Sequence, residues 1–571
     1  MPIDPIVFGL FEDDTGAIFR SLWEEHRIVL GPACALALGA AQAWLVLRPA
    51  RHTPRTAVQA TAAAIFPFLC LLVIRGRLGG FPLEALDFSV STEALLNAAV
   101  PNGPIALMVA IGERNLAQPM GGDPAGSLKR AGFTGPAQAA ALLGLTAADA
   151  TDAQVAEALF TRSRENPVAA AHPPHVVLVI MESWGADLLR YQSARNDVLG
   201  RLAPHLDRGL LFRRFVSGGN GTDASLEALV VATPFSPLLA GQGGHARYQQ
   251  AAALPFKAAG YHTVFGIGWT RTWRAIGRTY PNQGFDEVAD VVDVSAAVPE
   301  VREGTWGMPD AALFRWALGR LRRADEQGER LLLVLVTATN HTPYVLPDGY
   351  EAGPLDPSAL SGRPVGNPAL VMPQLATYQY ACDALGGFLD GLDAEGLSGK
   401  TIVAATGDHN LRELFQYPGT ADLPWRDRVP LFLQVPPAYL EGRPAPDLDR
   451  WAGHRDIFPT LAGLALSSAR IYRTGDDLLA PPSRPPRALA RFQTVLSDAG
   501  VTPRLGEAAA LCWTADGALS ADPGAPCRAS IAGIAREEQA LRGLLDWNVR
   551  RQAIDDRRRL KRLVMAATAG E

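Results

Sequence analysis

The sequence contains little that points to a nucleic-acid partner or to a zinc-finger type of site. Only four of the 571 residues are lysine, and 53 basic residues stand against 58 acidic ones, for a net charge of −5. Nucleic-acid-binding domains usually carry a clustered basic excess, so this balance argues against that partner. The five cysteines form no C-x-x-C pair or clustered Cys/His spacing. Cys512 and Cys527 are near each other in sequence, which suggests a disulfide but does not establish one.

Two uncharged apolar runs near the N-terminus predict membrane spans. They cover about 28–47 and 57–74, and each approaches the roughly 20 apolar residues that cross a bilayer. The loop between them, RPARHTPR, carries three arginines and therefore favours the cytoplasmic side. A pair of buried helices in a large soluble protein is the alternative. We expect a membrane region over 1–77, with the rest of the chain outside the cytoplasm.

Short apolar runs alternate with helical stretches from about residue 172 onward. Runs that are apolar throughout suit strands buried on both faces of a parallel sheet, and the helical stretches suit crossover connections. The sequence thus predicts an α/β fold with a mostly parallel central sheet flanked by helices over 172–490. A helical connector over 78–171 would precede it, and an extension over 491–571 with a charged helix would follow. The apolar runs lie at 175–181, 262–267, 331–336, 401–406 and 429–435.

Polar residues follow several of these predicted strands, where ligands gather in open α/β sheets. Glu182 follows one run, Asp408 and His409 follow another, and Thr222 follows a glycine-rich turn at 218–221. Each has a purely structural explanation: a helix cap, a hydrogen-bonded turn or a flexible loop. Together, however, a Glu, an Asp, a His and a hydroxyl suit one divalent metal in an oxygen-rich site.

The ordered set of motifs resembles the lipoteichoic acid synthase-like branch of the sulfatase/alkaline phosphatase superfamily, which includes phosphoglycerol transferases. The resemblance covers about 70–480 and implies an alkaline phosphatase-like fold. Its markers are M-E-S-W-G at 181–185, G-T-D-A-S at 221–225, T-N-H-T-P-Y at 339–344, G-D-H at 407–409 and H-R-D-I-F-P-T-L at 454–461.

This resemblance also implies the roles of individual residues. Glu182, Asp408 and His409 would ligate the metal together with the Thr222 hydroxyl, and His341 would contact the phosphoryl group or protonate a leaving oxygen. The mixed oxygen and nitrogen ligands favour Mn²⁺, with Mg²⁺ and Zn²⁺ as alternatives.

The residues that would bind the donor headgroup match the family pattern less closely. Trp273 and Arg274 are the best matches to the family's headgroup-binding residues, and Arg271 lies close behind them. The spacing there departs from the family pattern, as does Asn410, where a glycine is more usual.

The chemistry of these residues leads to a two-step transfer. Metal coordination favours the alkoxide of a threonine, which is otherwise a poor nucleophile. We expect Thr222 to attack the phosphorus of a phospholipid such as phosphatidylglycerol, and a hydroxyl on a glycan, glycolipid or polymer to attack the resulting phosphothreonine. The chain would then lie in a bacterial inner membrane with its catalytic domain in the periplasm. A sulfatase or phosphodiesterase-type hydrolase, a phosphoethanolamine transferase and a non-catalytic binding protein are the alternatives.

Overall fold

The computed structural model describes residues 120, 122–219, 221–241, 243–304, 306–411, 414–507, 509–522 and 524–568. By its internal contacts the chain divides into 1–116 and 117–571, and every described residue belongs to the second unit. Both predicted membrane spans and the connector up to residue 119 lie outside the described residues. Within the described part, no helix combines the length and the apolar character needed to cross a membrane.

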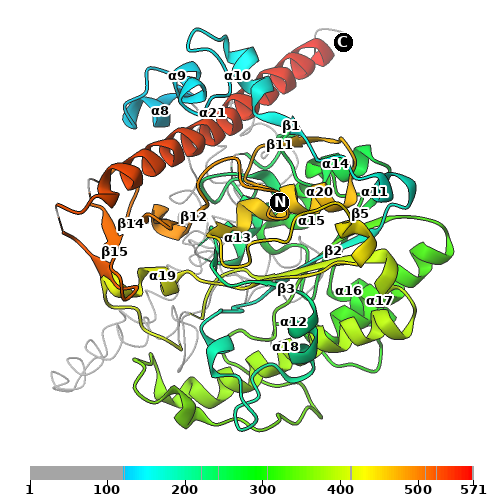
Figure 1. The fold of residues 1–571 in the computed structure, drawn as a ribbon. Coiled ribbons are helices and arrows are strands. Elements are labelled where there is room, and N and C mark those ends of the chain that lie inside the picture. The colour runs from blue at the N-terminus through cyan, green and yellow to red at the C-terminus, as the bar shows by residue number, and fades with distance from the viewer. Residues whose placement is uncertain are drawn as a thin grey trace, which may run out of the picture. The chain divides into compact units, whose positions relative to one another are not determined.

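A seven-stranded sheet forms the centre of this unit, with β2, β3 and β5 labelled in Figure 1. Its strand order is β3-β9-β8-β2-β7-β5-β6. The β8–β2, β2–β7, β7–β5 and β5–β6 pairs are parallel, whereas β9 is antiparallel to both of its neighbours, β8 and β3. The α/β fold is therefore confirmed, with a mixed sheet in which the run predicted at 429–435 enters in the opposite direction. The strands are β2 His175–Met181, β3 Leu210–Phe212, β5 His262–Ile267, β6 Glu287–Ala289, β7 Leu331–Val336, β8 Thr401–Gly407 and β9 Leu431–Gln434.

Both faces of the sheet are covered by helices, which is why its central strands are apolar throughout. Alternate residues of β2 enter different cores: Val176, Leu178 and Ile180 pack with α13 (Thr222–Val231) and α20 (Ile457–Ala465). On the other face, Val177, Val179 and Met181 pack with α17 (Asp310–Glu326) and α18 (Val371–Ala394). Smaller elements complete the layers: α11 Pro167–Ala171, α12 Ala203–Arg208, α14 Leu254–Ala258, α15 Ile276–Thr279, α16 Val291–Ala297 and α19 Leu423–Arg426.

A second, antiparallel sheet follows the central one. It has the order β12-β13-β14-β15-β16. A disulfide joins Cys512 on β15 to Cys527 at the start of α21, so the pairing that the sequence left open is present. The strands are β12 Arg487–Leu489, β13 Val495–Ser497, β14 Gly500–Thr502, β15 Leu511–Trp513 and β16 Leu519–Ser520, and α21 spans Cys527–Thr568.

The long helix α21 also supports the described part of the predicted connector. Leu128 and Phe133 pack against Ala540, Leu544 and Trp547 of α21 in a separate small core. This segment contains α8 Gly126–Arg130, α9 Pro136–Leu142 and α10 Asp152–Ala158, which lie along α21 in Figure 1. Two short pairs tie the remaining segments together: β1 (Phe160–Arg162) with β11 (Arg470–Tyr472), and β4 (Phe215–Val216) with β10 (Ala452–Gly453).

Candidate metal centre and nucleophile

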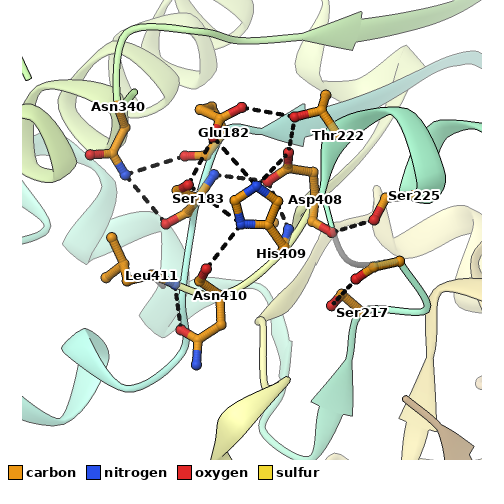
Figure 2. Close-up of polar contacts among 12 residues, drawn as sticks. Glu182, Ser183, Ser217, Thr222, Ser225, Asn340, Asp408, His409, Asn410 and Leu411 are labelled. Carbon is orange, nitrogen blue, oxygen red and sulfur yellow. Dashed lines mark hydrogen bonds and ion pairs between the residues drawn. The ribbon is translucent and has the colours of Figure 1, made fainter. Parts of the chain in front are cut away.

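Four predicted side chains converge at the carboxyl end of the central sheet (Figure 2). Glu182 follows β2, and Asp408 and His409 follow the neighbouring parallel strand β8, so their positions meet at one edge. Thr222 begins α13, and its Oγ1 lies 2.6 Å from Asp408 Oδ2 and 3.1 Å from Glu182 Oε2. His409 Nε2 lies 3.4 Å from Asp408 Oδ2 and 3.6 Å from Glu182 Oε1.

The geometry and burial of this cluster fit a divalent cation. One ligand atom from each of Glu182, Asp408 and His409 lies within 4.8 Å of the others, and all three residues are buried. Burial, followed by the nearby negative charge of Asp408, raises the pKa of Glu182 to about 7. Two carboxylates this close in a buried site repel each other, and a cation between them would offset both charges. These residues can therefore hold a metal, with the Thr222 hydroxyl as a further oxygen donor.

Backbone amides hold the Asp408 carboxylate in its position. Its Oδ1 accepts hydrogen bonds from the backbone N–H of Ser183 at 2.8 Å and of His409 at 2.7 Å. The other oxygen, Oδ2, is thereby directed to Thr222. The Ser183 hydroxyl donates to Glu182 Oε1 at 2.8 Å, and Ser183 has a φ of 51°, an unusual backbone conformation for a residue with a side chain.

The glycine-rich turn brings the start of α13 against the end of β8. A Cβ on Gly219 would lie 2.3 Å from Ser225 Oγ and 2.4 Å from the Ser225 nitrogen, so a side chain there would clash with the helix. This close approach lets the Ser225 hydroxyl donate to the Asp408 carbonyl oxygen at 2.6 Å. The turn therefore fixes the distance between the nucleophile candidate and the metal-ligand candidates.

His341 lies on the loop after β7, which is anchored to the same site. The Asn340 side chain donates to the carbonyl oxygens of Glu182 and Ser183 at 3.2 and 3.3 Å. The His341 ring is partly exposed, and its Nδ1 lies 2.9 Å from the Thr342 carbonyl oxygen. Because that carbonyl only accepts, Nδ1 carries the proton and Nε2 is left as the acceptor for proton transfer.

Trp306 packs against the His341 ring and was not among the predicted site residues. Its ring centroid is 4.2 Å from that of His341, and its Nε1 donates to the Thr342 carbonyl oxygen at 2.5 Å. Trp306 precedes Thr342 by 36 residues and belongs to no motif, so no local pattern indicates that it lies near His341.

The three candidates for the donor headgroup are placed differently. Arg274 Nε lies 3.6 Å from Asp223 Oδ2, directly beside the residue that follows Thr222. Arg271 instead pairs with Asp290 at 3.0 Å and donates to the Val288 carbonyl oxygen. Trp273 packs edge-on against Trp269, with ring centroids 5.6 Å apart. Of the three, Arg274 is thus the one whose guanidinium contacts the nucleophile's helix.

Comparisons with known proteins identify the family and the fold of this chain. The family model described as Sulfatase matches residues 174–467, which are 294 of the 571 residues. A protein of the alkaline phosphatase superfamily from Vibrio parahaemolyticus matches with 19% identity and a TM-score of 0.53, over 68% of this chain and 89% of its own. The lipoteichoic acid synthase LtaP from Listeria monocytogenes matches with 16% identity and a TM-score of 0.53, over 72% of this chain and 96% of its own. At these identities the two structures support an alkaline phosphatase-like α/β fold.

Proposed function

The chain belongs to the sulfatase family, whose members act on phosphate or sulfate esters, and from this premise we propose that it is a metal-dependent phosphotransferase with Thr222 as its nucleophile. The family match confirms the resemblance that the motifs indicated. The observation that carries the proposal is the position of Thr222 Oγ1, 2.6 Å from Asp408 Oδ2 and 3.1 Å from Glu182 Oε2. The C/S-x-P-x-R motif typical of sulfatases does not occur at Thr222, which favours phosphoryl over sulfuryl transfer.

The proposed reaction has two displacements at phosphorus. Glu182, Asp408 and His409 would hold the metal, which when bound favours the Thr222 alkoxide and offsets charge on the phosphate oxygens. As Thr222 Oγ1 bonds to phosphorus and the bond to diacylglycerol breaks, the proton of the Thr222 hydroxyl would pass to His341 Nε2 and from there to the leaving diacylglycerol oxygen. An acceptor hydroxyl then attacks the same phosphorus, the bond to Thr222 breaks, and the acceptor's proton restores the threonine hydroxyl.

The donor and the location follow from the predicted membrane region and the C-terminal disulfide. Two predicted spans would hold the site close to phospholipid, so we propose phosphatidylglycerol as the donor and a glycan, glycolipid or polymer hydroxyl as the acceptor. The Cys512–Cys527 disulfide supports an extracytoplasmic catalytic domain, because structural disulfides persist in oxidising compartments. Manganese is the proposed metal, on the strength of the mixed oxygen and nitrogen ligands.

Intact mass spectrometry of the protein after incubation with phosphatidylglycerol and Mn²⁺ tests this proposal. A glycerophosphate adduct on the peptide that contains Thr222 is expected in the wild type and should be missing in Thr222→Ala. Full lipid turnover by Thr222→Ala would exclude the covalent mechanism. An adduct that forms only with phosphatidylethanolamine would reassign the donor, and turnover of soluble esters alone would favour a hydrolase.

A further inference from the structure

Asn410 is a buried residue that the proposed mechanism does not use. It follows His409 directly at the end of β8 and is 3% exposed. Its side-chain amide donates to the Tyr417 hydroxyl at 2.9 Å and to the carbonyl oxygens of Trp425 and Arg426 at 3.0 and 3.2 Å. Its Oδ1 accepts the backbone N–H of Leu411 at 2.8 Å. Both ends of this amide are therefore fixed by neighbouring groups.

The rest of the site is shaped around this side chain. A Cβ added to Gly185 would lie 2.0 Å from Asn410 Oδ1, so the glycine after Trp184 leaves the space that the amide fills. Tyr417, which accepts a hydrogen bond from Asn410, donates in turn to Asp187 Oδ2 at 2.8 Å. Asp187 is fully buried and is also bound by Arg363 at 2.7 Å. Asn410 is thus joined through Tyr417 to the Asp187–Arg363 ion pair, and we call these contacts of the Asn410 side chain the clamp.

The backbone carbonyl of Asn410, the residue held by the clamp, is the hydrogen-bond partner of His409. The carbonyl oxygen of Asn410 lies 2.9 Å from His409 Nδ1 (Figure 2), and a carbonyl can only accept a hydrogen bond. The Ser183 hydroxyl lies 3.5 Å from the same nitrogen but donates its proton to Glu182 Oε1, so in a neutral His409 ring the proton sits on Nδ1. Its Nε2 lone pair consequently faces the site, 3.4 Å from Asp408 Oδ2 and 3.6 Å from Glu182 Oε1.

We propose that Asn410 is a positioning residue that sets the tautomer and ring orientation of His409 for metal binding. A metal-bound histidine commonly donates its other ring N–H to a carbonyl or carboxylate, and loss of such a partner typically weakens metal binding about 10- to 100-fold. Here the side chain of the same residue fixes that carbonyl. The inference rests on the metal site of the proposed function and adds to it a residue that positions one of the metal-ligand candidates.

Calorimetric titration of the full chain with Mn²⁺ tests the clamp. Asn410→Ala keeps the backbone carbonyl and removes only the side chain that positions it, so it is expected to weaken Mn²⁺ binding about 10-fold, the lower end of the range for loss of such a partner. Tyr417→Phe removes one of the clamp's hydrogen bonds and should weaken binding about 3-fold. Because Tyr417 acts through Asn410, the double variant should bind no more weakly than Asn410→Ala alone. Arg315→Lys is the control, since Arg315 pairs with Glu300 at the surface, away from these contacts, and the variant should bind Mn²⁺ as the wild type does.

A spectroscopic measurement tests the role of Asn410 independently of whether the site binds Mn²⁺. In metal-free protein labelled with ¹⁵N-histidine, the His409 signal, identified by its loss in His409→Gln, should show a protonated Nδ1 in the wild type. In Asn410→Ala it should show a mixture of tautomers. An unchanged tautomer in Asn410→Ala, or Mn²⁺ binding within twofold of the wild type, overturns the inference. Failure of the wild type to bind Mn²⁺ overturns the proposed function, and the tautomer signal then still decides the role of Asn410.

Discussion

His454 donates a hydrogen bond from Nε2 to the carbonyl oxygen of Gly407, 2.8 Å away, at the end of the strand that carries the metal-ligand candidates. Its Nδ1 accepts the backbone N–H of Gly218 at 3.4 Å, in the turn that leads to Thr222. One buried imidazole thus joins the two segments that form the site. Burial lowers the pKa of His454 to about 4, so the ring is neutral and able to accept from Gly218 at neutral pH.

Replacing His454 should remove part of the protein's sensitivity to acid. Its folded-state pKa of about 4 lies below the ordinary 6.5, so the unfolded chain takes up a proton first as the pH falls. The stability that the neutral ring contributes is present above pH 6.5 and is lost as the pH falls toward 4. Between pH 7 and pH 5 the wild type should therefore lose about 2 kcal/mol more than His454→Gln, whose amide can still donate to Gly407. Urea unfolding at the two pH values measures this difference, and equal losses in both proteins would contradict it.

Metal binding should depend on pH through Glu182. Its pKa of about 7 lies above the ordinary 4.5, so in metal-free protein the folded state keeps a proton that the unfolded state releases. The protonated Glu182 therefore stabilises the folded state of the metal-free protein. This stabilisation is complete below pH 4.5 and is lost as the pH rises through 7, a change of about 3 kcal/mol in the free energy of unfolding. Mn²⁺ competes with this proton. The increase in unfolding temperature on adding Mn²⁺ should therefore be larger at pH 8 than at pH 5.5.

Glu182→Gln provides the comparison for this pH dependence. The amide neither titrates nor offers a charged oxygen ligand, so the variant should bind Mn²⁺ weakly at both pH values. If the wild type shows the same Mn²⁺-induced shift at pH 5.5 and pH 8, proton competition at Glu182 is absent.

The central strands could be predicted from the sequence because burial on both faces produces continuous apolar runs. The metal-ligand candidates could be predicted because they directly follow two of these runs. The run at 175–181 coincides with β2, and the run at 401–406 lacks only Gly407 of β8. Strand direction is not encoded in such a run, so the antiparallel entry of β9 was not foreseen. The strands of the second sheet have two or three residues each, too few to show a period. Contacts such as Trp306 on His341 join distant segments and leave no local pattern.

The two arginines near Trp273 should respond differently to the same substitution. Arg274 faces Asp223 beside the nucleophile, whereas Arg271 is held by Asp290 and Val288. A guanidinium that contacts a donor phosphate contributes a charge-assisted hydrogen bond. Without it, the negative charge of the phosphate is less well compensated. Arg274→Gln should therefore lower kcat/KM for phosphatidylglycerol about 10- to 100-fold at unchanged unfolding temperature.

Arg271→Gln is the matched variant for this comparison. It leaves the buried Asp290 carboxylate without an ion-pair partner, so its main effect should be a lower unfolding temperature. Its effect on kcat/KM should be the smaller of the two. A larger catalytic loss in Arg271→Gln than in Arg274→Gln would reverse the assignment of the headgroup-binding arginine.

The disulfide should stabilise the junction between the second sheet and α21. It connects Cys512 on β15 with Cys527 at the first residue of α21, over a sequence separation of 15. Closing a loop of that length is worth about 3 kcal/mol in the chain-entropy model, because the unfolded chain loses conformational freedom. Cys512→Ser combined with Cys527→Ser should thus lower the free energy of unfolding by about that amount. Treatment with dithiothreitol should lower the free energy of unfolding of the wild type to the same value.

Cys382→Ser is the control, because this buried cysteine forms no disulfide. Dithiothreitol should destabilise that variant as much as it destabilises the wild type. If dithiothreitol leaves the stability of the wild type unchanged, the bridge does not constrain this junction, and the argument from the disulfide to an oxidising compartment fails with it.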